Sequence, residues 1–150
     1  MEGSTIINRA LPDVFNYLKM LKHIDQYNKW AMHDPHMRKT LTGTDGTVGF
    51  IFAWDSNDKN AGKGAQEIIA IKENERIDYE LRFEKPFKNI AYSSLIVQPS
   101  LSNQTMVTWT FNGRMRYPFN LLHVLLGLGK MLNKDIATSL QNLKSILEKK

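Results

Sequence analysis

The sequence predicts an α+β fold in which a curved antiparallel sheet of seven strands wraps around one long C-terminal helix. From about residue 37 the chain alternates apolar and polar residues with the period of two that is typical of strands. Short turn sequences separate these runs, so consecutive strands are expected to form an antiparallel meander. The last fifth of the chain repeats its apolar residues at spacings of three, four and seven, which is typical of one helix face.

The C-terminal helix is expected over Pro118–Lys149. Proline suits the first turn of a helix, where its missing N–H costs little. A helix of about 32 residues would be about 48 Å long, and so long an apolar stripe needs a broad partner. The β-rich middle of the chain is the segment that can supply one. The stripe consists of Leu122, Leu125, Leu126, Leu132, Ile136, Leu140, Leu143 and Leu147.

The N-terminal part of the chain is expected to form one strand and two short helices. The strand covers residues 4–8, and the first helix starts at Leu11, where a proline and an aspartate suit the first turn. A second helical piece covers about residues 23–31. It ends before Pro35, because the residue preceding a proline avoids the helical region. The predicted order is therefore one strand, two short helices, six further strands and one long helix.

Six runs in the middle of the chain are expected to be strands. The run at 48–54 is apolar on both faces, which favours a well-buried strand. The last run is expected to direct Val107, Trp109 and Phe111 inward. The most regular alternation puts four apolar residues on one face, namely Ile77, Tyr79, Leu81 and Phe83. The runs cover residues 37–42, 48–54, 64–72, 77–84, 89–98 and 104–115.

Length, charge and composition bound the class of protein. The 150 residues suit a single domain, over 1–150, and 42% of them are apolar. The net charge of +5 is scattered rather than gathered in a basic stripe, so no nucleic-acid partner is expected. There is no cysteine and no recognisable signal peptide. The longest apolar run, 121–132, is too short to span a bilayer. We therefore expect a cytoplasmic monomer or homodimer without stable membrane insertion.

Motifs for metal, phosphate or nucleophilic chemistry are weak in this sequence. His33, Asp34 and His36 could form part of a metal site. A zinc site needs at least three protein ligands, and no further histidine or carboxylate at a suitable spacing is evident to complete one. A polar loop is the preferred interpretation. The glycine pair around Lys63 lacks the other residues of a phosphate-binding loop. We therefore predict no metal and no cofactor, and no catalytic residue is identified.

Several short motifs carry a resemblance to a known superfamily. They are Ala10–Leu18 (ALPDVFNYL), Thr47-Val48-Gly49 with Trp54, Gly62–Gly64, Val107-Thr108-Trp109, and Asp135 with Leu140–Lys144 (LQNLK). With the element order, they resemble the helix-grip fold of the START-like, polyketide cyclase and SRPBCC superfamily, across essentially the whole chain. The chain is most similar to bacterial polyketide cyclase-like members. Because proteins of one fold serve many functions, the resemblance specifies chemistry poorly.

The resemblance implies a cavity between the sheet and the long helix that takes an apolar or amphipathic ligand. Inward aromatic side chains would then be partly core and partly cavity wall, and tyrosine hydroxyls could orient a ligand. His123, among leucines of the final helix, is either a polar handle in the cavity or an exposed residue beside the stripe. The predicted ligand-binding residues are Trp30, Phe52, Trp54, Tyr79, Leu81, Phe83, Tyr92, Trp109, Phe111, Leu122, His123 and Leu126.

Three functional hypotheses remain open. The first is a protein that binds a small hydrophobic molecule, such as a lipid-, sterol- or polyketide-like ligand, without covalent chemistry. The second is a polyketide cyclase or dehydratase that moves protons through Tyr79, Tyr92 or His123. The third is an interaction module that resembles the activators of heat-shock chaperones. Titratable groups that converge inside the cavity would favour the enzyme, an apolar lining the binding protein, and a closed interior the interaction module.

Overall fold

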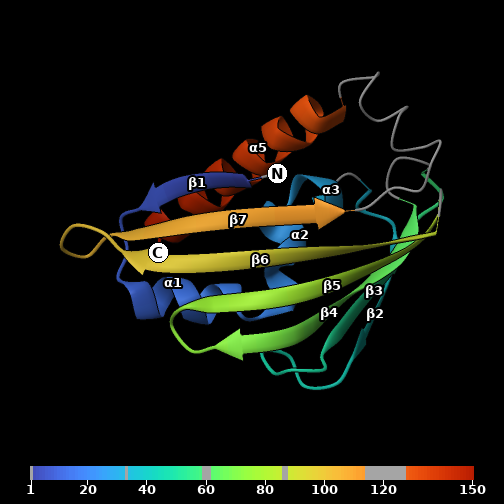
Figure 1. Cartoon of the computed structure of the whole chain (residues 1–150), viewed down its shortest axis with the longest axis horizontal. Helices are drawn as coiled ribbons and strands as arrows, with labels where there is room; N and C mark the ends of the chain where they lie inside the picture. The colour runs from blue at the N-terminus through green and yellow to red at the C-terminus, as the bar shows by residue number, and fades with distance from the viewer. Residues whose placement is uncertain (1, 33, 59–61, 86–87, 114–127) are drawn as a thin grey trace.

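A computed structural model shows a seven-stranded antiparallel sheet with short helices inside its curve and a long helix along one edge (Figure 1). The structure describes residues 2–32, 34–58, 62–85, 88–113 and 128–150. Within these residues the sheet order is β1-β7-β6-β5-β4-β3-β2, so the first strand joins the last and β2 forms the other edge. The strands are β1 (Glu2–Ile7), β2 (Arg38–Thr42), β3 (Ile51–Asp55), β4 (Lys63–Lys72), β5 (Arg76–Lys85), β6 (Asn89–Pro99) and β7 (Thr105–Gly113). The predicted α+β helix-grip fold is confirmed.

The helices follow the predicted order, with one refinement. The first is α1 (Leu11–Leu18), which has proline in its first turn, and the last is α5 (Leu128–Glu148). The predicted second helix is divided into η1 (Leu21–His23), α2 (Ile24–Tyr27) and α3 (Lys29–Met32). Asn28 separates α2 from α3 because its backbone is extended, with ψ of 117°. An asparagine side chain competes with helical hydrogen bonding, which explains the interruption.

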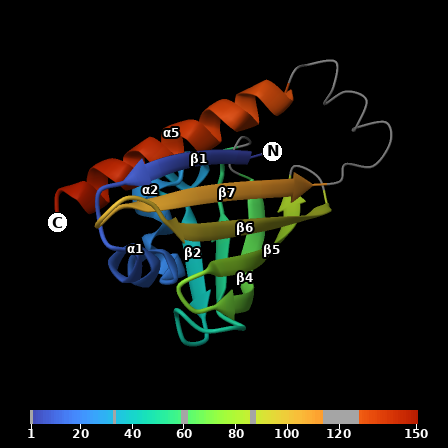
Figure 2. The same cartoon turned by 60° about the vertical axis from the view of Figure 1, so that its left-hand side comes forward.

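The C-terminal helix packs on the first strand of the sheet, and the two lie side by side in both views (Figures 1 and 2). Gly3 of β1 permits this close approach, because a Cβ atom there would lie only 2.6 Å from Cγ2 of Ile136. The buried stripe of α5 consists of Ile136, Leu140, Leu143 and Leu147, as the sequence predicts. The predicted start of this helix, 118–127, lies outside the described residues.

Two strands differ locally from the sequence expectation. The run at 48–54 becomes a strand only from Ile51, and Val48 lies in a turn with 60% of its surface exposed. In β4 the register with β5 shifts between Ile68 and Ala70, so one residue bulges out of the ladder. The bulge leaves Ala70 exposed and packs Ile71 against the core, which simple alternation does not predict.

None of the helices in the described ranges is long and apolar enough to cross a membrane.

Candidate functional site

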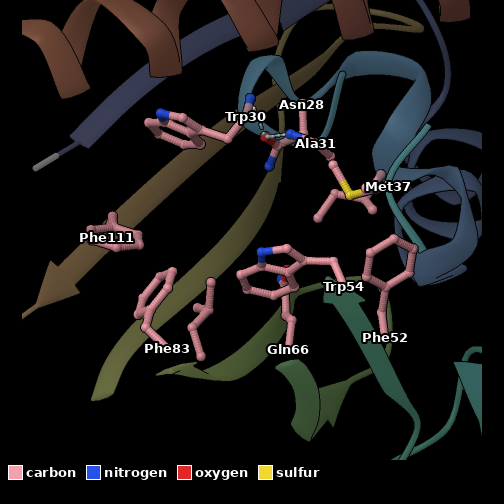
Figure 3. Close-up of a pocket in the computed structure, with 11 residues that line it drawn as sticks. Asn28, Trp30, Ala31, Met37, Phe52, Trp54, Gln66, Phe83 and Phe111 are labelled. Atoms are coloured by element: carbon pink, nitrogen blue, oxygen red, sulfur yellow. Dashed lines mark hydrogen bonds between the residues drawn. The ribbon is translucent and has the colours of Figure 1, made fainter. Parts of the chain in front are cut away.

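An apolar cavity of about 190 Å³ lies between the sheet and the α2–α3 segment (Figure 3). Strands β3, β4, β5 and β7 supply the side chains on the sheet side, and α2, α3 and the residues around them supply the other side. Nine of the eleven described lining residues are apolar and two are carboxamides. The lining consists of Ile24, Asn28, Trp30, Ala31, Met37, Phe52, Trp54, Gln66, Leu81, Phe83 and Phe111.

The sheet side of the cavity is built around one glycine. Trp54, Gly64 and Phe83 are direct partners across β3, β4 and β5, so all three face the interior. A Cβ atom on Gly64 would lie 2.8 Å from the Trp54 ring and 2.6 Å from the backbone oxygen of Arg82. The missing side chain therefore lets the indole lie close to the strand. Trp54 and Phe83 meet edge to face, with 5.8 Å between ring centroids.

The helical side of the cavity presents Trp30, which is held by two aromatic neighbours on β7. The Trp30 ring meets the Trp109 ring edge to face, with 5.6 Å between the ring centroids. It is tilted against the Phe111 ring, with 6.3 Å between those centroids. Trp109 is only 7% exposed, and its indole N–H donates a hydrogen bond to Ser93 at 2.7 Å. This bond orients Trp109, and Trp109 in turn supports Trp30 at the cavity wall.

The C-terminal helix fixes the position of the α2–α3 segment through polar contacts. The buried hydroxyl of Ser139 accepts the backbone N–H of Lys29 at 2.8 Å and donates to the carbonyl of Asp135. The Lys29 ammonium pairs with the Asp135 carboxylate at 2.9 Å. Asn142 donates to the carbonyl of Tyr27 at 3.2 Å. Both ends of the α2–α3 junction are thereby tied to α5.

Two buried carboxamides supply the polar atoms of the described lining. Asn28 is 6% exposed and Gln66 is 7% exposed. Asn28 lies with Trp30 and Ala31 on the helical side, and Gln66 lies behind Trp54 on the sheet side (Figure 3). The lining as described holds no side chain that carries a charge or titrates near neutral pH. The polar groups that these described residues offer to a bound molecule are therefore amide donors and acceptors.

The tyrosines of the interior are poor acids and bases. Burial, followed by nearby Tyr27, Asp45 and Asp78, raises the pKa of Tyr79 well above its usual value. Burial also raises the pKa of Tyr27, with a smaller contribution from Tyr17. Both hydroxyls therefore stay protonated near neutral pH. The Tyr79 hydroxyl is buried without a hydrogen-bond partner in the described part of the chain.

The structure brings six of the predicted ligand-binding residues together around the cavity, namely Trp30, Phe52, Trp54, Leu81, Phe83 and Phe111. Trp109 lies directly behind Trp30. Tyr79 lies on the inner face of β5 but is enclosed in the core rather than in the lining. Tyr92 is 51% exposed and lies on the outer face of β6, between the buried Ala91 and Ser93.

The described lining tests only part of the expected cavity wall. The sequence interpretation places the cavity against the C-terminal helix, whereas its described lining comes from the α2–α3 segment and includes no described side chain of α5. Leu122, His123 and Leu126 lie outside the described residues, so their binding role stays a prediction. The described part of α5 packs on β1 and contacts α2 and α3, so it holds the α2–α3 segment in place from behind.

Five lining residues do not feature among the predicted ones, namely Ile24, Asn28, Ala31, Met37 and Gln66. The sequence pattern could have identified one of these five residues. Gln66 alternates with Ile68 on β4, and a polar residue at an inward position of a buried strand calls for a partner. The four others come from the irregular segment around α2 and α3, where no periodic pattern marks the face that points inward.

The loop that carries His33, Asp34 and His36 has a structural role in the described part. The Asp34 carboxylate accepts the backbone N–H of His36 at 2.9 Å and also the hydroxyl of Ser56. His33 lies outside the described residues. Among those that are described, no three histidine, aspartate or glutamate side chains gather as metal ligands.

Three solved structures show how widely this fold occurs. A protein from Thermobifida fusca has 17% sequence identity and a TM-score of 0.70, with 99% of this chain and 93% of that chain covered. Truncated norcoclaurine synthase from Thalictrum flavum has 11% identity and a TM-score of 0.72, covering 98% and 91%. The Aha1 dimer from Colwellia psychrerythraea has 16% identity and a TM-score of 0.63, covering 99% and 95%. At these identities the likeness shows the fold alone.

Sequence comparison identifies the family. None of the curated proteins matches the chain. The family model described as "Polyketide cyclase / dehydrase and lipid transport" matches residues 1–148, which is nearly the whole chain. The element order, the sheet topology and the interior cavity agree with this match. The chain therefore belongs to the polyketide cyclase / dehydrase and lipid transport family.

Proposed function

We propose that this protein binds a small apolar or amphipathic molecule in the cavity between the sheet and the α2–α3 segment. The observation that carries the proposal is the lining, which is apolar and aromatic apart from two carboxamides. Such a lining is typical of small-molecule sites, where apolar walls supply affinity and a few polar groups supply orientation. The family description, which includes lipid transport, supports the same conclusion.

The size of the cavity favours a small ligand. Its volume is about 190 Å³, and a cavity of about 150 Å³ accommodates benzene. A molecule with one or two fused rings is therefore the appropriate scale for the part lined by described residues. Burial contributes about 25 cal/mol for each Å² of apolar surface, before the costs of association. Micromolar affinity is the expected result.

The family description also covers cyclases and dehydrases, so an enzyme is the second candidate. A cyclisation requires a group that can give or take a proton within hydrogen-bond distance of the substrate. The described lining offers carboxamides, which orient a substrate but do not exchange protons near neutral pH. This favours binding. The third candidate, an interaction module, is suggested by the similar fold of Aha1. That hypothesis expects a closed interior, whereas this protein has a cavity.

The test is a cavity-filling substitution with a matched control. Ala31 lines the cavity from α3, so Ala31→Leu should occupy part of the space. We expect it to weaken binding of a neutral naphthalene dye, prodan, by roughly tenfold, the scale of about 1–3 kcal/mol for overpacking. Ala137→Leu, on the exposed side of α5, should leave the affinity unchanged. Isothermal titration calorimetry gives both affinities, and circular dichroism checks the fold.

Two results would overturn the proposal. One is the absence of saturable binding by the folded wild-type protein across prodan, fatty acids, sterols and polycyclic aromatic molecules. The other is equal loss of affinity in Ala31→Leu and Ala137→Leu, which would place the dye on the surface. In the first case the interaction module becomes the better hypothesis.

A further inference from the structure

Gln66 is an unusual residue for its position in the sheet. It lies on the inner face of β4, between Phe52 of β3 and Leu81 of β5 in the hydrogen-bonded ladder. It is 93% buried, because only 7% of its surface is exposed. Both neighbours in the ladder are apolar and also line the cavity. A leucine or methionine would fill this position at lower cost, so the carboxamide needs a reason.

The Gln66 side chain has no hydrogen-bond partner in the part of the chain that the structure describes. Its carboxamide has one acceptor oxygen and two donor N–H groups, and all of them are left for the cavity. Its polar atoms are not among the fully buried atoms that lack a partner in the described residues, as the Tyr79 hydroxyl is, so the carboxamide meets the open space of the cavity and not the packed core. The residue therefore holds a donor and an acceptor in place for something that enters the cavity.

Asn28 presents a donor from the opposite side. Its Oδ1 atom accepts the backbone N–H groups of Trp30 at 2.9 Å and of Ala31 at 3.2 Å. These two bonds fix which end of the amide is oxygen, because a nitrogen there would face two donors. The Nδ2 group, which makes no hydrogen bond within the described residues, is the polar end that remains for the cavity.

We infer that the cavity selects a neutral aromatic molecule that carries a hydroxyl group. This inference rests on the proposed binding function and names the chemistry of its ligand. The hydroxyl donates to Oε1 of Gln66 and accepts from Nδ2 of Asn28, so both carboxamides gain partners at once. The rings pack on Trp54 and Phe83, whose edge-to-face arrangement forms the apolar wall.

The charges around the cavity explain why the ligand is neutral. The described lining contains no cation or anion that could compensate a charged ligand. Asp25 of α2 pairs with Lys39 of β2 at 2.6 Å, so these two charges offset each other. A carboxylate in this space would lose its hydration without gaining a partner of opposite charge, which is costly. A hydroxyl loses little, because the two carboxamides replace its water.

Three probes of the same ring system test this inference at pH 7. They are 2-naphthol, naphthalene and 2-naphthoate, which differ in a hydroxyl, no polar group and a carboxylate. We expect the wild-type protein to bind 2-naphthol roughly tenfold more tightly than naphthalene, as a pair of neutral hydrogen bonds allows. We expect 2-naphthoate to bind more weakly than 2-naphthol by at least about tenfold. Isothermal titration calorimetry measures all three.

Substitution of Gln66 tests the hydrogen bond to the ligand hydroxyl separately from the apolar packing of the rings. Gln66→Met keeps the length of the side chain and removes the carboxamide, so the preference for 2-naphthol over naphthalene should fall to roughly twofold. Naphthalene itself should bind as well as before or better. Gln98→Met, at an exposed position of β6, is the matched control and should keep the full preference.

Asn28→Asp provides a second variant. It retains an oxygen for the two backbone N–H groups and removes the Nδ2 donor, so 2-naphthol should again lose its advantage over naphthalene. Melting temperatures of the variants show that each is folded.

The outcomes distinguish the two proposals. Equal binding of 2-naphthol and naphthalene by the wild type overturns the inference but leaves the binding function standing. A preference for 2-naphthol that survives Gln66→Met also overturns it, as does tightest binding of 2-naphthoate. If none of the three probes binds to the folded protein, both the inference and the binding function are wrong.

Discussion

The two ends of the interior are built from similar apolar residues but are packed differently. The closed end is a buried cluster to which β1, β7, α1 and α5 each contribute. Its members without exposed surface include Ile7, Phe15, Val107, Ile136 and Leu143. At the open end, β3, β4 and β5 face the α2–α3 segment around a cavity of about 190 Å³. Apolar composition alone therefore does not decide whether an interior is filled; the shape and support of the side chains do.

A glycine defines the geometry at each end. Gly3 lets α5 approach β1 so closely that a Cβ atom at this position would lie 2.6 Å from Cγ2 of Ile136 and 3.4 Å from Cδ1 of Leu140. Gly64 lets one indole lie close to the strand instead. Rigid rings that meet edge to face cannot collapse into the remaining space as leucines would, so the open end keeps its cavity.

Removal of Trp109 should have the largest effect, because this residue joins the two ends. Trp109→Ala loses a buried indole, its hydrogen bond to Ser93 and the support of Trp30. We expect the free energy of unfolding to fall by about 3–5 kcal/mol, and the affinity for prodan to fall as well. Urea denaturation and calorimetric titration of the folded variant measure the two effects.

Leu140→Ala is the control at the closed end. Leu140 is 1% exposed on α5 and is not part of the cavity lining. We expect a loss of about 2–5 kcal/mol in unfolding free energy, with the prodan affinity unchanged. The comparison would break if this variant weakened binding, or if Trp109→Ala cost under about 1 kcal/mol, which is the range of a surface residue.

A methyl group on Gly64 should have an intermediate effect that is concentrated at the open end. The nearest atom to the new Cβ is the backbone oxygen of Arg82 at 2.6 Å, which cannot move aside as a flexible side chain does. We expect Gly64→Ala to reduce the unfolding free energy by about 1–3 kcal/mol and to change binding by displacing Trp54. Unchanged stability together with unchanged prodan affinity would refute this account of the wall.

The outer face of the sheet should contribute least, and with a distinctive pH dependence. Partial burial of Asp78 opposes its ionisation, but hydrogen bonds from Arg76 and Ser94 prevail and lower the pKa of its carboxyl. A lowered pKa in the folded state stabilises the fold above the unfolded value of 3.8, and this contribution is lost as the pH falls through the folded value.

We therefore expect Asp78→Asn to be less stable than the wild type at pH 7, by under about 1 kcal/mol because the group is partly exposed. The difference should shrink as the pH falls below 3.8. Denaturation midpoints from pH 7 down to pH 2.5 measure it. A difference that grows toward acid pH would have the wrong sign for this interpretation. Prodan affinity should stay unchanged, since Asp78 belongs to neither end of the interior.

The fold was predictable because its signals extend over many residues. The alternation that places Ile77, Tyr79, Leu81 and Phe83 on one face and the stripe of α5 both persist in the structure. Local errors arose where one residue changed the phase. The bulge before Ala70 and the late start of β3 at Ile51 depend on pairing with neighbouring strands, which a single run does not contain.

The site was predictable only in part. Aromatic residues on inward strand faces, such as Trp54 and Phe83, were identifiable from alternation. The helical wall was not, because α3 is a four-residue helix that Asn28 starts and that Ser139 and Asp135 of α5 hold in position. Contacts between residues so far apart in the chain leave no local pattern. The sequence therefore indicated side chains of the sheet that line the cavity, but not the α2–α3 segment that faces them.

The placement of the tryptophans gives the protein an optical property. The chain has three of them; Trp30 and Trp54 line the cavity, and Trp109 lies against Trp30. All of the tryptophan fluorescence of this protein therefore originates within or beside the cavity that is proposed to exchange water for a ligand. Indole emission depends on the polarity of the surroundings of the ring. Unlabelled protein should therefore report, through the wavelength and intensity of its own emission, whether that space is wet or occupied.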